Sequence, residues 1–187
     1  GIGKSTLVNV LAGLEQVESG TVLLGGVSLG GLREPWLRST IALIPQQAYV
    51  FAGSLRENLR YLAPHSTEQD LDRTVFALGL EDLVHMCGGY DGRLRSDELS
   101  EGQKQLVALA RVHMSAARIV ILDEATCHLD AWSEEHVERA FARRAGTLIV
   151  IAHRISSALR SDRVLLLDNQ GIQAGTHGML LQRSSTY

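Results

Sequence analysis

Short runs rich in apolar residues recur along the chain and predict its strands. They cover residues 21–24, 27–29, 41–44, 119–122, 147–151, 164–167 and 171–174. The runs at 119–122 and 147–151 are rich in aliphatic and β-branched residues, as expected of strands buried on both faces of a parallel sheet. The first two runs flank a Gly-Gly pair and predict short scaffold strands, and the last predicts a hairpin arm.

Apolar residues at helical spacing fill most of the intervals between these runs. They predict helices over 7–14, 35–38, 131–144 and 177–182. Further helices are expected to begin at Ser54 and after Ser100, and two more to lie between residues 66 and 86, the first ending near residue 80. The helices between Gln46 and the strand at 119–122 are expected to form a helical lobe. Strands that alternate with helices are typical of the α/β class.

Length, composition and charge limit the range of functions. The chain has 187 residues, 45% of them hydrophobic and 21% charged, which is typical of a globular protein with one core. A formal net charge of −3 gives no electrostatic reason to expect nucleic acid. No apolar run approaches the roughly 18 residues of a membrane span, so membrane contact would need a partner or another part of the polypeptide. Cys87 and Cys127 lack metal-ligand spacing and are expected to be ordinary packing residues.

The first six residues, GIGKST, match the second half of the phosphate loop GxxxxGK[ST]. In that loop backbone N–H groups surround the phosphates of a nucleotide, Lys4 reaches the β and γ phosphates, and the Ser5 hydroxyl meets Mg²⁺. The amphipathic helix expected over 7–14 would present its N-terminus to the same phosphates. This motif predicts a nucleotide site.

A second phosphate-directed feature lies at the helix that follows Ser100. Ser100 and Gln103 have the spacing of a capping box, and Gly102 leaves the backbone open to close approach. The N–H groups of the first helical turn and the positive end of the helix dipole attract anions. The alternative interpretation is an ordinary helix start.

A third feature is the acidic pair Asp123 and Glu124 at the end of the strand over 119–122. Open α/β sheets bind their ligands at the carboxyl ends of the strands. Because side chains alternate along a strand, the two carboxylates are expected to do different work, one holding a metal ion and the other facing a water molecule. The alternative is a solvated turn, which the phosphate loop upstream disfavours.

Three single residues complete the candidate site. Gln46 follows a predicted strand and a proline, and is placed to reach Mg²⁺ or the attacking water. His153 stands just past another strand, at the sheet edge that is expected to carry the other site residues. Asp130 precedes a predicted helix and serves either as its N-cap or as part of the site.

These motifs occur in the order and approximate spacing found in the ATPase domain of ABC transporters, which the chain resembles along its whole length. The combination of LSEGQ at 99–103 with ILDE at 121–124 is specific, because kinases and GTPases with a phosphate loop lack the first of these. The resemblance implies an α/β fold with a RecA-like P-loop NTPase core, a small antiparallel β subdomain and a helical subdomain inserted at about 54–115. It implies one ATPase domain over 1–187, whose phosphate loop begins before Gly1.

The resemblance also implies roles for the motif residues. The ATP phosphates would be held by Gly1, Ile2, Gly3, Lys4, Ser5, Thr6 and Gln46. Mg²⁺ would be surrounded by Ser5, Gln46 and Asp123. Glu124 resembles the general base for the hydrolytic water, and His153 resembles the switch that touches the γ-phosphate. In the family two domains bind head to tail, so the ATP of the opposite subunit would be served by Ser100, Gly102, Gln103 and Asp130.

The partners that the resemblance implies are those of an exporter. The segments at 51–59, 152–168 and 175–181 are similar to the exporter branch of the family. There the ATPase domain follows a transmembrane domain in one polypeptide, at the cytoplasmic face of the membrane, and the segment after Gln46 receives its coupling helices. We therefore expect an ATP-hydrolysing motor domain with a second ATPase domain, identical or different, and no nucleic acid.

Two other functions are weighed against this one. A soluble ABC-type ATPase that acts on nucleic acid or ribosomes is disfavoured by the neutral-to-acidic charge and the exporter-like tail. A regulatory domain that binds ATP without hydrolysing it is disfavoured by the presence of both Glu124 and His153. Apolar runs of about 20 residues upstream of Gly1 would indicate the transporter, and their absence the soluble ATPase.

The sequence departs from the family pattern at three points. Glu101 stands where the family most often has glycine and brings a carboxylate near a phosphate site, unless its side chain points away. The segment GRLRSD at 92–97 is shorter than the usual exporter pattern. The aromatic residue that stacks on adenine in the family would precede Gly1, so the preference for ATP rests on the resemblance.

In the family a further strand, which precedes the phosphate loop, lies between the strands expected at 147–151 and 164–167. Without that strand, two hydrophobic strand edges would be exposed. We predict that residues 1–187 expressed alone are poorly soluble and hydrolyse ATP weakly, as measured by gel filtration and phosphate release. A well-behaved active monomer would contradict this prediction.

Overall fold

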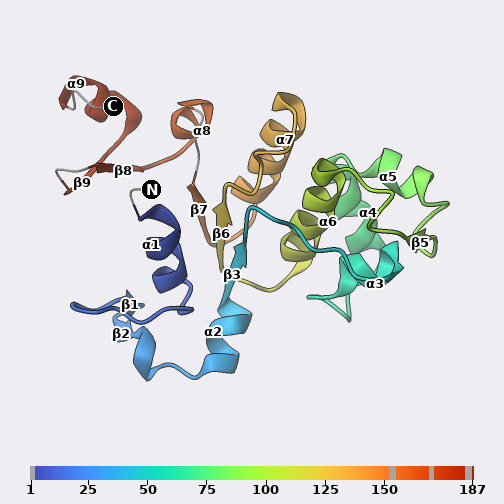
Figure 1. Cartoon of the computed structure of the whole chain (residues 1–187), viewed down its shortest axis with the longest axis horizontal. Coiled ribbons are helices and arrows are strands. Elements are labelled where there is room, and N and C mark those ends of the chain that lie inside the picture. Colours follow the sequence, from blue (N-terminus) through green and yellow to red (C-terminus); the bar gives the residue numbers. More distant parts are fainter. Residues whose placement is uncertain (1–2, 152–154, 169–170, 184–186) are drawn as a thin grey trace.

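A three-stranded parallel sheet forms the centre of the protein (Figure 1). The computed structural model describes residues 3–151, 155–168, 171–183 and 187. The strands are β3 (Ile41–Ile44), β6 (Ile119–Asp123) and β7 (Thr147–Ile151), in the order β3-β6-β7. Ile44 pairs with Leu122, and Asp123 pairs with Ile151. The three strands therefore end at the same edge of the sheet.

Helices lie on both sides of this sheet (Figure 1). Their bounds are α1 (Lys4–Leu11), α2 (Glu34–Thr40), α3 (Leu55–Arg60), α4 (Glu68–Leu78), α5 (Glu81–Met86), α6 (Glu101–Met114), α7 (Ala131–Ala142), α8 (Ile155–Leu159) and α9 (His177–Arg183), with a 3₁₀ turn η1 (Leu29–Gly31). The predicted helices are confirmed to within a few residues. One expectation is wrong: α1 ends at Leu11, so Leu14 is exposed instead of packing on an apolar helix face. Within the described segments, no helix combines the length and apolar content that crossing a membrane requires.

The two faces of β6 explain its unbroken apolar sequence. Ile121 is fully buried against Val8 of α1 and Leu37 of α2. Val120 and Leu122 are buried in the larger core with residues of α6 and α7. The prediction of a strand buried on both faces is thus confirmed for β6. The side chains of β7 are only half-buried, because β7 pairs with β6 alone among the described strands.

Three short antiparallel pairs lie outside the central sheet. They are β1 (Leu23–Leu24) with β2 (Val27–Ser28), β4 (Gly53–Ser54) with β5 (Arg93–Leu94), and β8 (Val164–Asp168) with β9 (Gly171–Gly175). The first and third pairs agree with the predicted runs. The second has no signal in the sequence, because two-residue strands are too short for a periodic pattern. It joins the chain before α3 to the segment that leads into α6.

Capping boxes begin three of the helices between residues 54 and 115. The pairs are Ser54 with Glu57, Thr67 with Asp70, and Ser100 with Gln103. In each pair the first side chain accepts a backbone N–H of the opening turn, which would otherwise lack an acceptor. The apolar faces of these helices join β3 and β6 in one core. The division into an inserted helical subdomain at about 54–115 stays a prediction.

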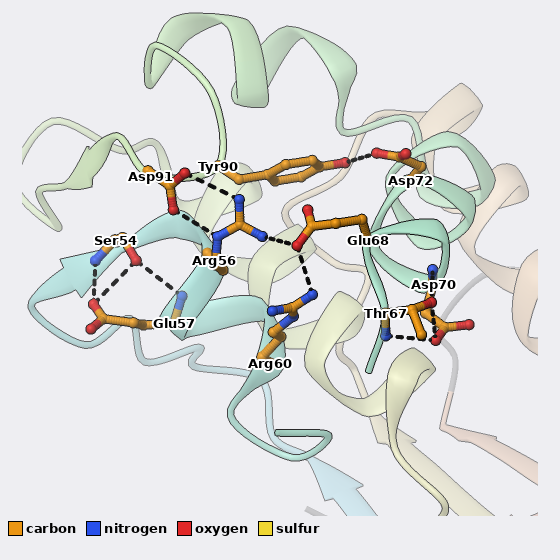
Figure 2. Close-up of polar contacts among 10 residues, drawn as sticks. All are labelled: Ser54, Arg56, Glu57, Arg60, Thr67, Glu68, Asp70, Asp72, Tyr90 and Asp91. Atoms are coloured by element: carbon orange, nitrogen blue, oxygen red, sulfur yellow. Dashed lines mark hydrogen bonds and ion pairs between the residues drawn. The ribbon is translucent and has the colours of Figure 1, made fainter. Parts of the chain in front are cut away.

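A charged network ties α3, α4 and the segment after α5 together (Figure 2). Arg56 donates from Nε to Oδ1 of Asp91 at 2.6 Å and from Nη1 to Glu68. These hydrogen bonds hold the pKa values of both carboxyls below their usual range. Next to them the Tyr90 hydroxyl donates to Asp72 at 2.7 Å. Because exposed ion pairs contribute little to stability, the network serves mainly to fix the position of the segment that contains β5.

His113 of α6 lies in a largely buried polar contact with α4 and α7. Its Nδ1 is 3.2 Å from Oγ1 of Thr74, and its ring meets Phe141 edge to face at 5.5 Å between centroids. Burial, and secondarily the charge of Arg144, lowers the pKa of His113 to about 4. The imidazole is therefore neutral in the folded protein at pH 7.

We predict that His113 makes stability depend on pH. Its folded pKa lies below the ordinary value of 6.5, so the unfolded chain binds more protons between these pH values. The free energy of unfolding should fall by up to roughly 3 kcal/mol as the pH drops from 7 to 4. In thermal unfolding, the midpoint should fall less between pH 7 and pH 5 in His113→Gln than in the unmodified protein. An equal fall in both would contradict the prediction.

Candidate functional site

The N-terminus of α1 lies at the end of the molecule where the parallel strands also end (Figure 1). Gly3 precedes the helix with φ at 83°, a left-handed conformation that glycine adopts without strain. Lys4 and Ser5 open the first turn, where N–H groups lack helical acceptors and the dipole is positive. Lys4 is half-buried and Ser5 is exposed. Of the other predicted loop residues, Thr6 is exposed in the same turn, whereas Gly1 and Ile2 lie outside the described residues.

Asp123 closes β6 at the same sheet edge. Its Oδ1 is buried and has no hydrogen-bond partner among the described residues. A buried carboxylate oxygen of this kind fits a hard cation such as Mg²⁺, which takes oxygen ligands. The described residues contain no group of three or more His, Cys, Asp or Glu side chains placed to hold a metal ion. Any cation here would therefore need ligands of other kinds, such as a hydroxyl, an amide or a phosphate.

Gln46 lies in the loop that follows β3, at the end of the sheet where Asp123 and Glu124 follow Leu122 of β6. Its Nε2 lies 3.9 Å from Sγ of Cys127, three residues after Glu124. The loop is held from behind, because the buried side chain of Gln105 on α6 donates to the carbonyl of Pro45 at 3.3 Å. The expectation that Cys127 is an ordinary packing residue is wrong. This thiol is exposed and contacts Gln46.

Glu124 adopts a conformation that is rare outside glycine. Its φ is 52°, and it is the one non-glycine residue with positive φ in the described part of the chain. Strain of this kind concentrates at functional sites. Glu124 donates its N–H to the carbonyl of Ile151 at 3.3 Å, which fixes the turn against the end of β7. His153, two residues beyond Ile151, lies outside the described residues.

The expectation about the acidic pair needs one correction. The sequence predicts that strand alternation points the two carboxylates in different directions. However, β6 ends at Asp123, so Glu124 lies outside the strand. The left-handed turn at Glu124, not the pleat of the strand, sets the direction of the second side chain. The start of α1, with Lys4, and the end of β6, with Asp123 and Glu124, nevertheless lie at the same end of the molecule (Figure 1). That these three residues share one site stays a prediction.

A separate hollow of about 420 Å³ lies at the start of α6. Its lining residues are Ser100, Glu101, Gly102, Gln103, Leu106, His128, Leu129, Asp130 and Ser133. The predicted capping box is present: Gln103 N–H donates to Ser100 Oγ at 3.2 Å, and Ser100 N–H donates to Gln103 Oε1 at 2.9 Å. The lining contains none of the described phosphate-loop residues and neither Asp123 nor Glu124.

The group that approaches the backbone of Gly102 closely is a carbonyl of the same chain. A Cβ at this position would lie 3.0 Å from the carbonyl oxygen of His128. Asp130, two residues later, caps α7 by accepting the N–H groups of Trp132 and Ser133, both at 2.9 Å. These hydrogen bonds hold the pKa of the Asp130 carboxyl below its usual range. The N-cap interpretation of Asp130 is thus confirmed, and its contact with a second subunit stays a prediction.

Sequence reasoning missed the buried polar residues behind the site. Arg111 of α6 is buried and donates from Nε to the carbonyl of Asn58 at 2.9 Å, and from its Nη atoms to Oδ1 of Asn58 and the carbonyl of Tyr49. A signal was available, because Arg111 is four residues after Val107 and so stands on the apolar face of the helix. Asn58 and Gln105 have no comparable signal.

Comparison with known proteins agrees with this geometry. A family model described as ABC transporter matches residues 1–127. The chain belongs to the ABC transporter family. That membership carries nucleotide binding with it, and the α/β fold is that of an ABC-type P-loop NTPase.

Relatives of this ABC transporter chain include much longer proteins. It is 48% identical to the ABC transporter ATP-binding protein RamB of Streptomyces coelicolor, covering 100% of this chain and 31% of that protein. It is 42% identical to the lactococcin transport/processing ATP-binding protein LcnC-like of Lactococcus lactis, covering 100% and 27%. The chain thus spans less than a third of the length of these relatives.

A solved structure shares the fold of this ABC transporter chain. It is the ATP-bound structure of a bacterial Atm1-family ABC exporter, with a TM-score of 0.89 and 29% sequence identity. The match covers 98% of the present chain and 33% of the exporter chain. The described α/β arrangement is therefore that of an exporter's nucleotide-binding part.

We predict that Gly102→Ala distorts the hollow at the start of α6 and lowers the rate of ATP hydrolysis. The added Cβ would force α6 and the His128 carbonyl apart by a few tenths of an ångström. Because a misplacement of about 1 Å can cost roughly 10²-fold in rate, we expect a loss of roughly tenfold if this turn contacts the nucleotide. ATP hydrolysis by the full-length protein measures the effect. Gly178→Ala is the matched control, because a Cβ there meets nothing within 4 Å. Equal activity of both variants would contradict the prediction.

Proposed function

We propose that this chain is the ATP-binding and ATP-hydrolysing motor domain of an ABC exporter. The observation that carries the proposal is that α1, which begins at Lys4, starts at the end of the molecule where β6 ends with Asp123 and the strained Glu124 (Figure 1). Phosphoryl transfer to water requires cationic and N–H groups for the phosphates, an oxygen ligand for a cation and a base for the water. Lys4 and the start of α1, the Asp123 Oδ1 that lacks a partner in the described segments, and the Glu124 carboxylate match these components.

Two copies of such a domain would complete each other's sites. The hollow at α6 contains first-turn N–H groups but none of the described residues of the phosphate-loop edge. A nucleotide held at the sheet edge of one subunit can therefore be closed over by Ser100, Gly102 and Gln103 of the other, in a head-to-tail dimer. Asp130 would lie at the same interface. The second subunit is either identical or different.

Hydrolysis would proceed by attack of water on the γ-phosphorus of ATP. Glu124 accepts the proton of the attacking water as the new oxygen–phosphorus bond forms and the bond to the β-phosphate oxygen breaks, releasing ADP. Lys4 and the N–H groups that begin α1 bind the phosphates. His153 is assigned the contact with the γ-phosphate by resemblance. Mg²⁺, held by Ser5, Gln46 and Asp123, would neutralise charge on the phosphate oxygens.

The exporter assignment draws on the relatives. Their names include a lactococcin transport/processing ATP-binding protein and a fatty acid ABC transporter ATP-binding/permease protein of Mycobacterium tuberculosis, the latter 33% identical. We propose that the present chain likewise works with a transmembrane domain, N-terminal in the same polypeptide, at the cytoplasmic face of the membrane. The loop after Gln46 would receive the contact of that domain.

We predict that Glu124→Gln in the full-length protein lowers ATP turnover by about 10²–10⁴-fold, the usual loss on removal of a general base. ATP binding should persist, because the amide keeps the size of the side chain, and an ATP-bound dimer should accumulate. Phosphate release and gel filtration with ATP measure the two effects. Glu81→Gln, at an exposed position of α5, is the matched control. Unchanged turnover in Glu124→Gln would remove this residue from its role.

A further inference from the structure

The hollow at the start of α6 carries more negative charge than a phosphate site should. Two of its lining residues are the acids Glu101 and Asp130. Like charges repel, so free carboxylates at this position would oppose the entry of a triphosphate. They would also compete with the phosphates for the first-turn N–H groups of the helix. The contacts of each carboxylate therefore decide whether the hollow can take an anion.

The Asp130 carboxylate is occupied by hydrogen bonds from the first turn of α7. One carboxylate oxygen accepts the N–H groups of Trp132 and Ser133, and the other accepts the Ser133 hydroxyl at 2.8 Å. Its charge is thus engaged at the N-terminus of α7, where a carboxylate is stabilising. Glu101, in contrast, belongs to the first turn of α6 itself.

Glu101 is held by a lysine on the next turn of α6. Nζ of Lys104 donates to Oε1 of Glu101 at 2.7 Å. The Lys104 side chain is 18% exposed, whereas that of Glu101 is 56% exposed, so the cation is the more fixed partner of the pair. The hydrogen bond from Lys104 holds the pKa of the Glu101 carboxyl below its usual range. The carboxylate is therefore ionised, and its charge is paired.

The fold alone does not explain this ion pair. Exposed pairs three residues apart on a helix contribute little to stability. Arg139 and Glu135 make a comparable pair four residues apart on α7, and neither lines the hollow. What distinguishes the pair of Glu101 and Lys104 is that its carboxylate lies in the first turn of α6 and lines the hollow.

We propose that Lys104 is a positioning residue of the α6 half-site, which binds the Glu101 carboxylate so that the triphosphate of a nucleotide on the opposite subunit can approach the first turn. The inference rests on the proposed function, since it assumes that this half-site closes on ATP. It assigns a role to a residue pair in which Glu101 departs from the family's usual glycine. Lys104 acts on the nucleotide through Glu101 and not by direct contact.

A double-mutant cycle in the full-length protein tests the proposal. Lys104→Gln should raise the KM for ATP by roughly three- to thirtyfold, the range of coupling between neighbouring charges, with a smaller change in kcat. In the Glu101→Gln background the same Lys104→Gln change should alter KM by less than about twofold. The single-variant effect should shrink at high ionic strength, because salt screens the repulsion. Arg139→Gln, which breaks the pair on α7, should leave KM as it is.

The possible results separate this inference from the proposed function. An equal rise of KM in both backgrounds would mean that Lys104 acts independently of Glu101 and would overturn the inference, as would an unchanged KM in Lys104→Gln. If the unmodified protein shows no Glu124-dependent phosphate release, the proposed function fails instead. In that case the same double-mutant cycle can be measured without hydrolysis, as the ATP concentration that gives half-maximal dimerisation of each variant. That measurement then decides the inference.

Discussion

The buried guanidinium of Arg111 is the constraint that fixes the arrangement of the helices around the sheet. A charge removed from water must be matched by hydrogen bonds, or the fold loses several kcal/mol. The guanidinium of Arg111 donates to the carbonyls of Asn58 and Tyr49. Its Cζ atom also lies 4.1 Å from the centroid of the Phe51 ring. Burial lowers its pKa to about 10, so it stays protonated at pH 7. The loop after Gln46, α3 and α6 are thereby held in one relative position.

This constraint connects the two halves of the candidate site. Gln46 belongs to the loop whose Pro45 carbonyl accepts from Gln105, and Gln105 and Arg111 lie on the same helix. The N-terminus of that helix carries the hollow with Ser100. A displacement of the Gln46 loop would therefore strain the contacts of α6 directly. Because Asn58 also accepts the N–H of Phe51 at 3.0 Å, a shift of the loop would break a partly buried hydrogen bond.

Local sequence patterns predicted the elements but not the contacts between distant segments. The runs at 41–44, 119–122 and 147–151 are recognisable as strands because aliphatic residues dominate each of them, and β6 is buried on both faces as such a run predicts. The capping box at Ser100 was equally readable, since it spans four consecutive residues. The contacts of Arg111 join residues more than 50 positions apart, and no local period encodes them. Likewise, no local pattern predicts the positive φ of Glu124 or the hydrogen bond from its N–H to the distant carbonyl of Ile151.

The exceptions to ordinary folding rules gather where the chemistry is proposed. Asp123 has a buried oxygen without a partner in the described residues, and Glu124 is a non-glycine residue in a left-handed conformation. Glu101 places a carboxylate in the first turn of a helix that is suited to anions, and Lys104 donates a hydrogen bond to it. In the proposed function each of these residues has a ligand: a cation for Asp123, a water for Glu124 and a triphosphate for the first turn of α6. Natural sequences violate local rules mainly at functional sites. The unpartnered oxygen of Asp123 and the positive φ of Glu124 therefore support the proposed nucleotide chemistry by an observation other than the motifs.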